Sequence, residues 1–552
     1  MLTELDRRFD EMLAAVTGPG GRVVLGKDAQ GRTIVENLPP TLPGLFRTFA
    51  GTNGEAEAVV AGDERLTFAD LDRISERVAH GLVTRGIGKG DRVAIAMRNC
   101  PSWIVVYMGI LKAGGVATLL NGWWEEKEME HAIRLTEPKL IVADAARGKR
   151  IAAKCSDSDI LMVAVERPVE QAVAELLRAD EDTALPEIGP EDDATILFTS
   201  GSTGDSKGAL STHRAVTTAT YAYATGLIVL LGILTKEGRA PTAQSRTLLS
   251  VPLFHVTGEV PVMINSFVIG RCMVIMPKWD ATEALRLIEK EKITYFVGVP
   301  TMSLELMNHP DRSKYDLSSL TDITAGGAPR PVSHVERLRS EFPNAQPALG
   351  YGLTETNAAG CANYWGNYAA KPASTGRPQR PYIELAILGA DDRHLPSGEI
   401  GEIAIRSASN IKCYWRNPEA TAALFTADGY ARTGDVGYLD EDGYLFIVDR
   451  KKEIIIRGGE NIAAAEVEAE CYACPDVAEV AVFGVPDERL GEVPIAVIHG
   501  KNGLSEEGLR AFLEPRIARF KIPARFIFSP EPLPKLGTGK IDRPRLKAQY
   551  AH

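Results

Sequence analysis

Directly after a short apolar run (residues 195–198), the chain reads Thr199-Ser-Gly-Ser-Thr-Gly-Asp-Ser-Lys-Gly208. Two glycines three positions apart allow the backbone to turn its N–H groups inward, while hydroxyl side chains and Lys207 add donors and a cation. Such groups suit the oxygens of a polyphosphate. The spacing differs from that of the P-loop, because Lys207 is followed by glycine. We interpret the stretch as a different phosphate-binding loop, with an ordinary flexible loop as the alternative.

Short apolar runs alternate with helical patterns on both sides of this loop. Thr67 is placed to cap a helix whose apolar residues repeat at helical spacing, and another helix is expected over residues 101–112. This alternation predicts an α/β fold with largely parallel sheets covered on both faces. Beyond residue 376, short strands between Gly/Asp turns indicate an antiparallel, barrel-like unit, and residues 453–552 fit a small α+β domain.

Composition narrows the class of protein. At 552 residues, the chain is too long for one core, so at least two domains are expected. A net charge of -11 argues against nucleic acid as a partner. Seven scattered cysteines are typical of reduced thiols and predict a cytoplasmic location. The longest apolar run, residues 227–234, is shorter than the roughly 20 residues of a membrane span, so no transmembrane segment is expected.

Further stretches accompany the loop along the chain. They are Pro252-Leu-Phe-His-Val-Thr-Gly258, Ala325-Gly-Gly-Ala-Pro329, Tyr351-Gly-Leu-Thr-Glu-Thr356, Arg432-Thr-Gly-Asp435, Val448-Asp-Arg-Lys-Lys-Glu453, Gly458-Gly-Glu-Asn461 and Pro534-Lys-Leu-Gly-Thr-Gly-Lys-Ile-Asp542. In this order they resemble the adenylate-forming superfamily: acyl-CoA synthetases, peptide-synthetase adenylation domains and firefly luciferase. The resemblance covers residues 66–546.

This resemblance implies a large N-terminal domain of two packed α/β sheets and a distorted barrel, followed by a small mobile domain. We therefore expect an N-terminal extension (1–50), a large domain (51–448), a hinge (449–452) and a C-terminal domain (453–552). It also implies a two-step reaction. A carboxylate attacks the α-phosphate of ATP to form acyl-AMP and pyrophosphate, and the thiol of coenzyme A then displaces AMP.

The catalytic chemistry must neutralise two anions, and Lys540 on its glycine-rich loop is a suitable mobile cation. By resemblance, Glu355 holds Mg²⁺ together with Thr199, and His255 lies between the acyl and nucleotide pockets in a gating and orienting role. Rotation at Lys452 would exchange Lys540 for the glycine loop that lines the pantetheine tunnel. The expected CoA-binding residues are Gly458 and Gly459.

The nucleotide site is expected to combine a stacking ring, a turn that lets the base approach closely, and polar partners for ribose and phosphate. Its expected residues are Thr199, Ser200, Gly201, Ser202, Thr203, Gly204, Lys207, Gly326, Gly327, Ala328, Tyr351, Gly352, Leu353, Thr354, Asp435, Ile447 and Arg450. The expected acyl pocket comprises His255, Val256, Val299, Thr324 and Asn357.

Three departures from the family pattern bear on the interpretation: Ser206 replaces a usual proline in the loop, a usual proline is missing before the C-domain helix (residues 461–466), and Glu259 lies near the acyl pocket. If Glu259 faces that pocket, a plain alkyl substrate is disfavoured. Amino acids are disfavoured because Phe254 is followed by His255 rather than Asp. We predict an acid:CoA ligase for a fatty, aryl or other hydrophobic acid.

Other readings remain open at this stage. A CoA-independent acyl-AMP ligase and a nucleotide binder without catalysis are the alternatives to a ligase. A helix-like segment from Ala215 leads to the apolar run that ends at Leu234, and a polar stretch (235–246) follows. We interpret this part of the chain as a buried helix followed by a surface loop, with a lid or peripheral membrane contact as the alternative, and the role of residues 224–246 stays open. A homodimer is also compatible with the sequence.

Overall fold

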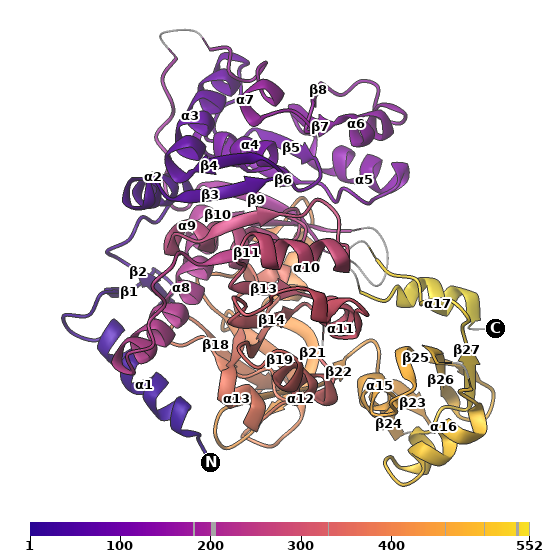
Figure 1. Cartoon of the computed structure of the whole chain (residues 1–552). Helices are drawn as coiled ribbons and strands as arrows, with labels where there is room; N and C mark the ends of the chain where they lie inside the picture. The colour runs from indigo at the N-terminus through magenta and orange to yellow at the C-terminus, as the bar shows by residue number, and fades with distance from the viewer. Residues whose placement is uncertain are drawn as a thin grey trace.

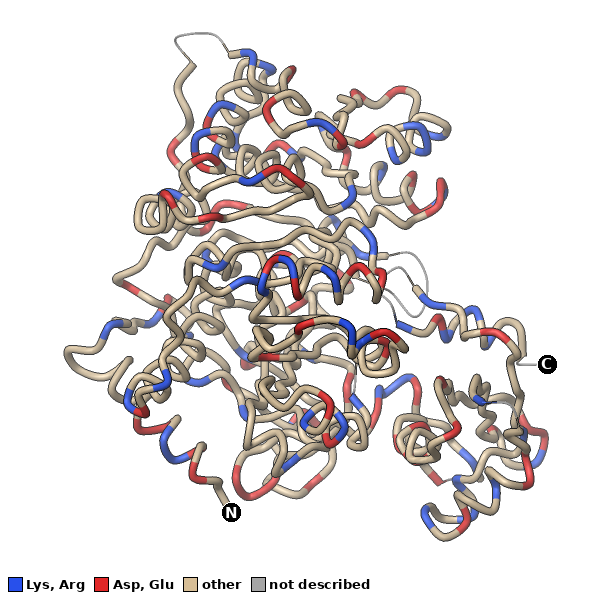
Figure 2. The backbone as a smooth tube through the Cα atoms, viewed as in Figure 1, with Lys and Arg blue, Asp and Glu red and all other residues tan. Residues whose placement is uncertain are grey.

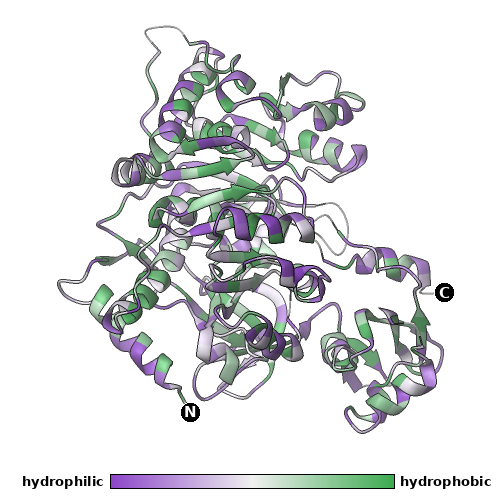
Figure 3. Ribbon diagram, in the orientation of Figure 1, coloured by the Kyte–Doolittle hydropathy of each residue, from purple (hydrophilic) through white to green (hydrophobic). Residues whose placement is uncertain are grey.

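The computed structural model describes residues 1–179, 183–199, 206–328, 330–458, 460–501, 503–536 and 540–550. A large body extends from the N-terminus to β22 (Leu445–Arg450), and the chain after β22 forms a smaller body beside it (Figure 1). The small body has its own apolar core, in which Ile455, Val482 and Ile498 are buried. Figure 3 shows the strands mainly in hydrophobic colours and the outer helices with hydrophilic faces.

The first sheet carries the phosphate loop. Its central strands are parallel, and β10 pairs antiparallel with both β9 and β20. In spatial order the strands are β20 (Cys413–Tyr414), β10 (Gly208–Thr212), β9 (Asp193–Phe198), β6 (Val116–Leu119), β5 (Arg92–Ala96), β7 (Leu140–Asp144) and β8 (Ile160–Val163).

Helices pack around this sheet at places that local patterns predict. Thr67 caps α3 (Phe68–Thr84), where its hydroxyl accepts from the N–H of Asp70 at 3.1 Å. The helix expected over residues 101–112 is α4 (Pro101–Lys112), which is wholly buried. The other helices of this region are α2 (Leu42–Asn53), α5 (Glu126–Thr136), α6 (Ala145–Ala152) and α7 (Val169–Ala172).

The second sheet is parallel in its centre and antiparallel at its ends. Its strands are, in spatial order, β17 (Arg377–Pro378), β16 (Cys361–Tyr364), β15 (Gln346–Tyr351), β14 (Asp322–Gly326), β13 (Tyr295–Gly298), β11 (Arg246–Leu249), β12 (Cys272–Ile275), β3 (Glu57–Ala61) and β4 (Glu64–Thr67). Its connecting helices include a π-helix (Gly258–Ile264), α9 (Asn265–Ile269), α10 (Ala281–Lys290), α11 (Pro300–Asn308), α12 (Val332–Glu341) and α13 (Trp365–Ala370). The expected α/β architecture with two large sheets is confirmed.

Three smaller sheets are also present among the described residues, and one of them is the antiparallel pair of β1 (Leu25–Lys27) and β2 (Thr33–Val35). The antiparallel unit after residue 376 is a four-stranded sheet of β18 (Glu384–Leu388), β19 (Gly401–Arg406), β21 (Ala431–Leu439) and β22. The small domain contains β24 (Glu460–Ile462), β23 (Ile455–Arg457), β26 (Gly491–Gly500), β25 (Val477–Asp487) and β27 (Arg525–Phe528), with α15 (Ala464–Tyr472), α16 (Glu506–Leu513) and α17 (Arg543–Tyr550). A further helix is α14 (Pro418–Leu424).

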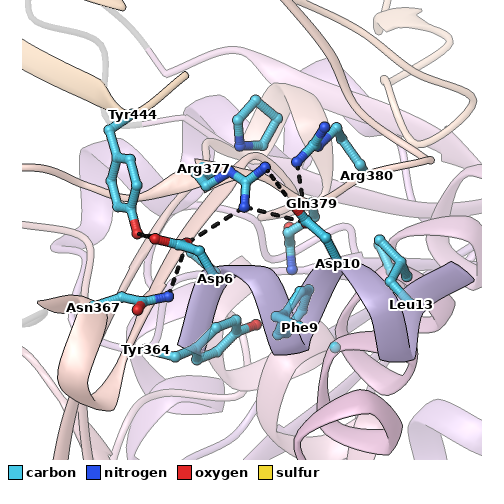
Figure 4. A pocket seen from close by; sticks show the side chains of 14 residues that line it. Asp6, Phe9, Asp10, Leu13, Tyr364, Asn367, Arg377, Gln379, Arg380 and Tyr444 are labelled. Atoms are coloured by element: carbon cyan, nitrogen blue, oxygen red, sulfur yellow. Dashed lines mark hydrogen bonds and ion pairs between the residues drawn. The ribbon is translucent and has the colours of Figure 1, made fainter. Parts of the chain in front are cut away.

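The N-terminal helix α1 (Glu4–Thr17) is held on the large domain by a buried carboxylate. Asp6 is 1% exposed and accepts hydrogen bonds from the Tyr444 hydroxyl (2.8 Å) and the Asn367 amide (3.0 Å). Arg377 pairs with both Asp6 and Asp10 around a cavity of about 40 Å³ (Figure 4). Because Tyr444 directly precedes β22, these contacts tie the N-terminus to the strand that leads into the small domain.

Helix α8 (His213–Lys236) corrects one expectation. It is 24 residues long with a mean hydropathy of 1.6, so by length and composition it could cross a membrane, although the apolar run within it is short. However, 72% of that stretch is buried inside the protein, where α8 packs against α1 and α9. Most of the segment therefore serves as a core helix, as the buried-helix interpretation expected.

Candidate functional site

The phosphate loop connects β9 to β10. Because these two strands pair antiparallel, the two ends of the loop lie side by side. The Thr199 N–H donates to the Lys207 carbonyl at 3.0 Å. Five expected binding residues, Ser200, Gly201, Ser202, Thr203 and Gly204, lie outside the described residues.

At the described end of this loop, an aromatic residue connects the Lys207 cation to an acid. The Lys207 ammonium lies 4.9 Å from the centre of the Tyr414 ring, and the Tyr414 hydroxyl donates to Glu355 Oε1 at 2.6 Å. The fold thus brings Lys207 and Glu355 to one place through Tyr414, a residue that the sequence analysis missed. Its position in β20, beside β10, becomes apparent only when the sheet is formed.

A second group of polar side chains comes from β15, β21 and β22. The Tyr351 hydroxyl donates to Asp435 Oδ2 at 2.7 Å, and Arg450 Nε lies 3.2 Å from Asp435 Oδ1. Asp435 and Arg450 are direct neighbours in the β21–β22 pairing, and Ile447 lies on β22 opposite Gly437. Burial raises the pKa of the Asp435 carboxyl, while the positive charge of Arg450 acts in the opposite direction.

Backbone geometry explains two glycines of the predicted site. Gly327 has φ +74°, a conformation that favours glycine. At Gly352 an added Cβ would lie 1.9 Å from the Ala358 carbonyl oxygen, so no larger residue fits. Gly326 ends β14, and the other predicted residues of these two turns are Ala328, Leu353 and Thr354.

Lys540 of the small domain reaches this turn on the large domain. A Cβ added to Gly327 would lie 3.3 Å from Lys540 Cε and 3.5 Å from its Nζ. The Lys540 carbonyl accepts from the Leu536 N–H at 2.7 Å, which closes the loop that carries the lysine. Burial, together with the nearby Arg450 charge, lowers the pKa of Lys540 from 10.5 to about 8, against the opposing charge of Asp435.

His255 is uncharged near neutral pH. Burial, with the Lys540 charge nearby, lowers the pKa of His255 to about 3. Its Nδ1 accepts from the Thr257 backbone N–H at 3.3 Å, and the backbone N–H of His255 donates to the Pro252 carbonyl at 3.1 Å. A neutral imidazole suits an orienting role better than that of a cation.

The expected acyl-pocket residues differ in their surroundings. Val256 is 3% exposed and Val299 is 7% exposed, and they belong to two separate apolar clusters. Thr324 is partly buried on β14. The Asn357 amide is fully buried and donates to the Ser211 hydroxyl at 3.0 Å and the Ser409 carbonyl at 2.9 Å, so it has structural partners of its own.

Glu259 lies in the π-helix and is directed into the core. It is 0% exposed, and its Oε1 accepts from the Tyr107 hydroxyl of α4 at 2.7 Å. Burial raises the pKa of the carboxyl to about 8. The two cavities described in this structure do not include Glu259 in their lining. Glu259 was expected to disfavour an alkyl substrate only if it faced the acyl pocket. It faces neither of these two cavities, so it gives no reason to exclude an alkyl acid from them.

A cavity of about 250 Å³ lies next to the loop that carries Lys540. Its walls combine apolar and cationic side chains from seven separate segments of the chain. They are Arg98, Asn99, Trp123, Arg147, Ser250, Pro252, Phe254, Pro277, Lys278, Trp279, Thr301, Met302, Glu305, Lys535 and Leu536. No local motif marks Arg98, Arg147 or Lys278, which explains why the sequence analysis missed them.

Two elements of the predicted hinge mechanism can be located. Lys452 lies in the exposed turn that follows β22. Gly458 forms the turn between β23 and β24, where its N–H donates to the Leu490 carbonyl at 2.7 Å, and Gly459 lies outside the described residues. Gly458 does not line the cavity described above.

Among the described residues, no group of three or more His, Cys, Asp or Glu side chains is arranged to hold a metal ion. Glu355 and the Thr199 hydroxyl nevertheless offer hard oxygen donors, which suit Mg²⁺ because this ion commonly takes one or two protein ligands together with phosphates and water.

The structure thus consists of a large and a small domain, and Lys540 of the small domain lies against the Gly327 turn of the large one. Comparison with known families agrees. The AMP-binding enzyme model matches residues 46–415, and the model for the AMP-binding enzyme C-terminal domain matches residues 466–540. The chain belongs to this family, and with it to the adenylate-forming superfamily that its motifs resemble.

Individual relatives match over nearly their full length. A long-chain-fatty-acid–CoA ligase of Bacillus subtilis is 34% identical, with 92% of this chain and 94% of the relative covered. A feruloyl-CoA synthase of Amycolatopsis sp is 34% identical, with 90% and 96% covered. The ATP-bound structure of MatB from Rhodopseudomonas palustris has a TM-score of 0.82 at 28% identity, covering 92% and 99% of the two chains. The apo structure of MatB gives 0.73.

Proposed function

We propose that this protein is an ATP-dependent carboxylic acid:CoA ligase of the AMP-forming type. The observation that carries the proposal is the position of Lys540 over Gly327, beside Asp435 and Arg450. A cation from one domain faces a polar nucleotide-type site on the other, which is what the joining of a carboxylate and a triphosphate requires.

In the first half-reaction, a carboxylate oxygen of the acid attacks the α-phosphorus of ATP. The bond to the bridging oxygen breaks and pyrophosphate leaves. Lys540 stabilises the negative charge that builds up on the α-phosphate and the acid, because a buried cation acts strongly in a site that excludes water. Lys207 and the loop N–H groups bind the outer phosphates. Glu355 and Thr199 would hold Mg²⁺, which would supply further charge neutralisation at the phosphates.

Asp435 and Tyr351 form the nucleoside end of the proposed site. The Asp435 carboxylate accepts from the ribose hydroxyls, and the hydrogen bond from Tyr351 orients it (2.7 Å). The Tyr351 ring stacks on the base, and the glycine turn at Gly327 lets the base approach the backbone. His255, neutral at physiological pH, orients the acid between the two pockets.

In the second half-reaction, the sulfur of CoA attacks the acyl carbonyl and AMP leaves with its phosphate oxygen. The cationic cavity at Arg98, Arg147 and Lys278 supports this step, because CoA carries phosphates at one end and an apolar arm at the other. Rotation at Lys452 would bring Gly458 and Gly459 to the arm. The higher TM-score of ATP-bound MatB, 0.82 against 0.73 for apo MatB, supports assigning the present arrangement to the first half-reaction.

The acid is proposed to be hydrophobic, either fatty or aryl. Relatives that match over nearly their full length are named for long-chain fatty acids, ferulate and 4-coumarate. A panel of octanoic, dodecanoic, ferulic and 4-coumaric acids, assayed for CoA-dependent AMP release, tests both the reaction and the class of acid. Acyl-adenylate trapped by hydroxylamine, without thioester, would refute the CoA step. The absence of pyrophosphate exchange with every acid would refute the adenylation step.

A further inference from the structure

The loop that carries Lys540 is attached to the large domain by an ion pair. In Figure 1 the yellow segment before α17 extends from the small domain toward α10 and α11. There Lys535 Nζ lies 3.1 Å from Glu305 Oε1 of α11 and 2.9 Å from Glu479 Oε1 of β25. One ammonium group therefore bridges a carboxylate of each domain.

Glu305 is itself held in place from the other side. The indole N–H of Trp279 donates to Glu305 Oε2 at 2.6 Å, so both carboxylate oxygens have partners. Glu305 is also the one acidic side chain among the described residues that line the cationic cavity. Its counter-ion, Lys535, belongs to the small domain, so the pairing depends on how the two domains are arranged.

The ion pair is close to the catalytic lysine along the chain. Lys535 forms a β-bridge with Ile541, and the Leu536 N–H donates to the Lys540 carbonyl at 2.7 Å. The two ends of the loop are thus tied together immediately around Lys540. A contact that fixes Lys535 on α11 consequently restricts where Lys540 can lie.

We propose that Glu305 is a positioning residue that selects the adenylation arrangement by holding Lys535, and with it the Lys540 loop, on α11. This inference rests on the proposed two-step function. When the small domain rotates for the CoA step, Glu305 loses Lys535 but keeps Trp279. The pair therefore favours the first half-reaction and contributes nothing to the second.

The expected effect is modest because solvent screens the pair. Glu305 is 41% exposed and Lys535 is 27% exposed, and such ion pairs shift an equilibrium by about twofold to fivefold. Lys535 is a poor target for mutation, since it also pairs with Glu479, whose other oxygen accepts from the Leu533 N–H at 2.7 Å. Glu305 is the cleaner probe.

The test compares Glu305→Gln with a matched control, Glu283→Gln. Glu283 is 42% exposed and pairs with Arg286 within α10, so the control removes the same charge from an ion pair confined to the large domain. Two rates are measured for each protein: ATP–pyrophosphate exchange with dodecanoic acid, and single-turnover formation of dodecanoyl-CoA from synthetic dodecanoyl-AMP. If only aryl acids react in the panel, ferulic acid and feruloyl-AMP replace these probes.

We expect Glu305→Gln to lower exchange twofold to fivefold without lowering thioester formation, and Glu283→Gln to change neither rate. Glu305→Lys, which places a cation against Lys535, should lower exchange further. In 1 M NaCl, where the Debye length is about 3 Å, the deficit of Glu305→Gln should shrink. Equal losses in both half-reactions, or unchanged exchange in both Glu305 variants, would overturn the proposal. Failure of the wild-type protein in both assays would instead refute the proposed function.

Discussion

Replacement of Lys540 by alanine should abolish most of the adenylation half-reaction. Lys540 Cε and Nζ lie 3.3 and 3.5 Å from the position of a Cβ on Gly327, so the side chain is already within the nucleotide-type site. Its pKa is lowered from 10.5 to about 8, mainly by burial, which corresponds to about 3 kcal/mol of cost for holding the charge there. The attraction between an anionic substrate and the lysine would offset this cost. Removal of one such donor typically slows a reaction about 100-fold to 1,000-fold.

Two assays separate this effect from a general loss of folding. ATP–pyrophosphate exchange reports the first half-reaction, and synthetic acyl-AMP supplied with CoA reports the second. Lys540→Ala should lose exchange but retain thioester formation, because Lys540 leaves the site when the small domain rotates. Lys501→Ala, an exposed lysine paired with Asp476 within the small domain, serves as the control and should keep both rates. Undiminished exchange in folded Lys540→Ala protein would refute the reasoning.

Three further outcomes follow from buried charges. The kcat/KM of exchange should fall as the pH rises through about 8, where free Lys540 loses its proton, and a flat profile to pH 10 would contradict this. Between pH 4.5 and about 8, folded protein keeps the Glu259 proton that the unfolded chain releases, so its stability falls by up to about 1.4 kcal/mol per pH unit. Urea unfolding should therefore show Glu259→Gln gaining more relative stability at pH 8 than at pH 5, and an equal difference at both would argue against a buried, protonated carboxyl. Asp6→Ala should lower the free energy of unfolding by about 3 kcal/mol, against less than about 1 kcal/mol for the more exposed Asp10→Ala, and equal losses would show that burial of Asp6 is not decisive.

Neither the net charge nor the distribution of charged residues along the chain shows where the proposed nucleotide site lies. Along the backbone tube of Figure 2, Lys/Arg positions and Asp/Glu positions are interspersed in both domains. The net charge of -11 therefore says little about where an anionic nucleotide would bind. The cations that matter here, Lys207, Lys540 and those of the cavity, are few and come from distant segments.

Structural features that depend only on neighbouring residues could be predicted from the sequence. The start of α3 at Thr67, the bounds of α4 and the strand that precedes the phosphate loop depend on local periodicity and capping, which are visible in the sequence. The strand that follows the loop, β10, was not predicted. The family motifs belong to the same kind of information. The helix expected from Ala215 to Leu234 lies within α8, which extends it by two residues at each end.

Features that depend on which segments meet were decided by the tertiary structure. Tyr414 joins Lys207 to Glu355 only because β20 pairs with β10. The direction of Glu259 depends on the turn of the π-helix against α4. Two partners of Asp6, Asn367 and Tyr444, lie more than 350 residues away along the chain. The pairing of Lys535 with Glu305 depends in turn on how the two domains meet. Local sequence specifies what a residue can do chemically, whereas its partner, burial and pKa are set by the side chains that folding places around it.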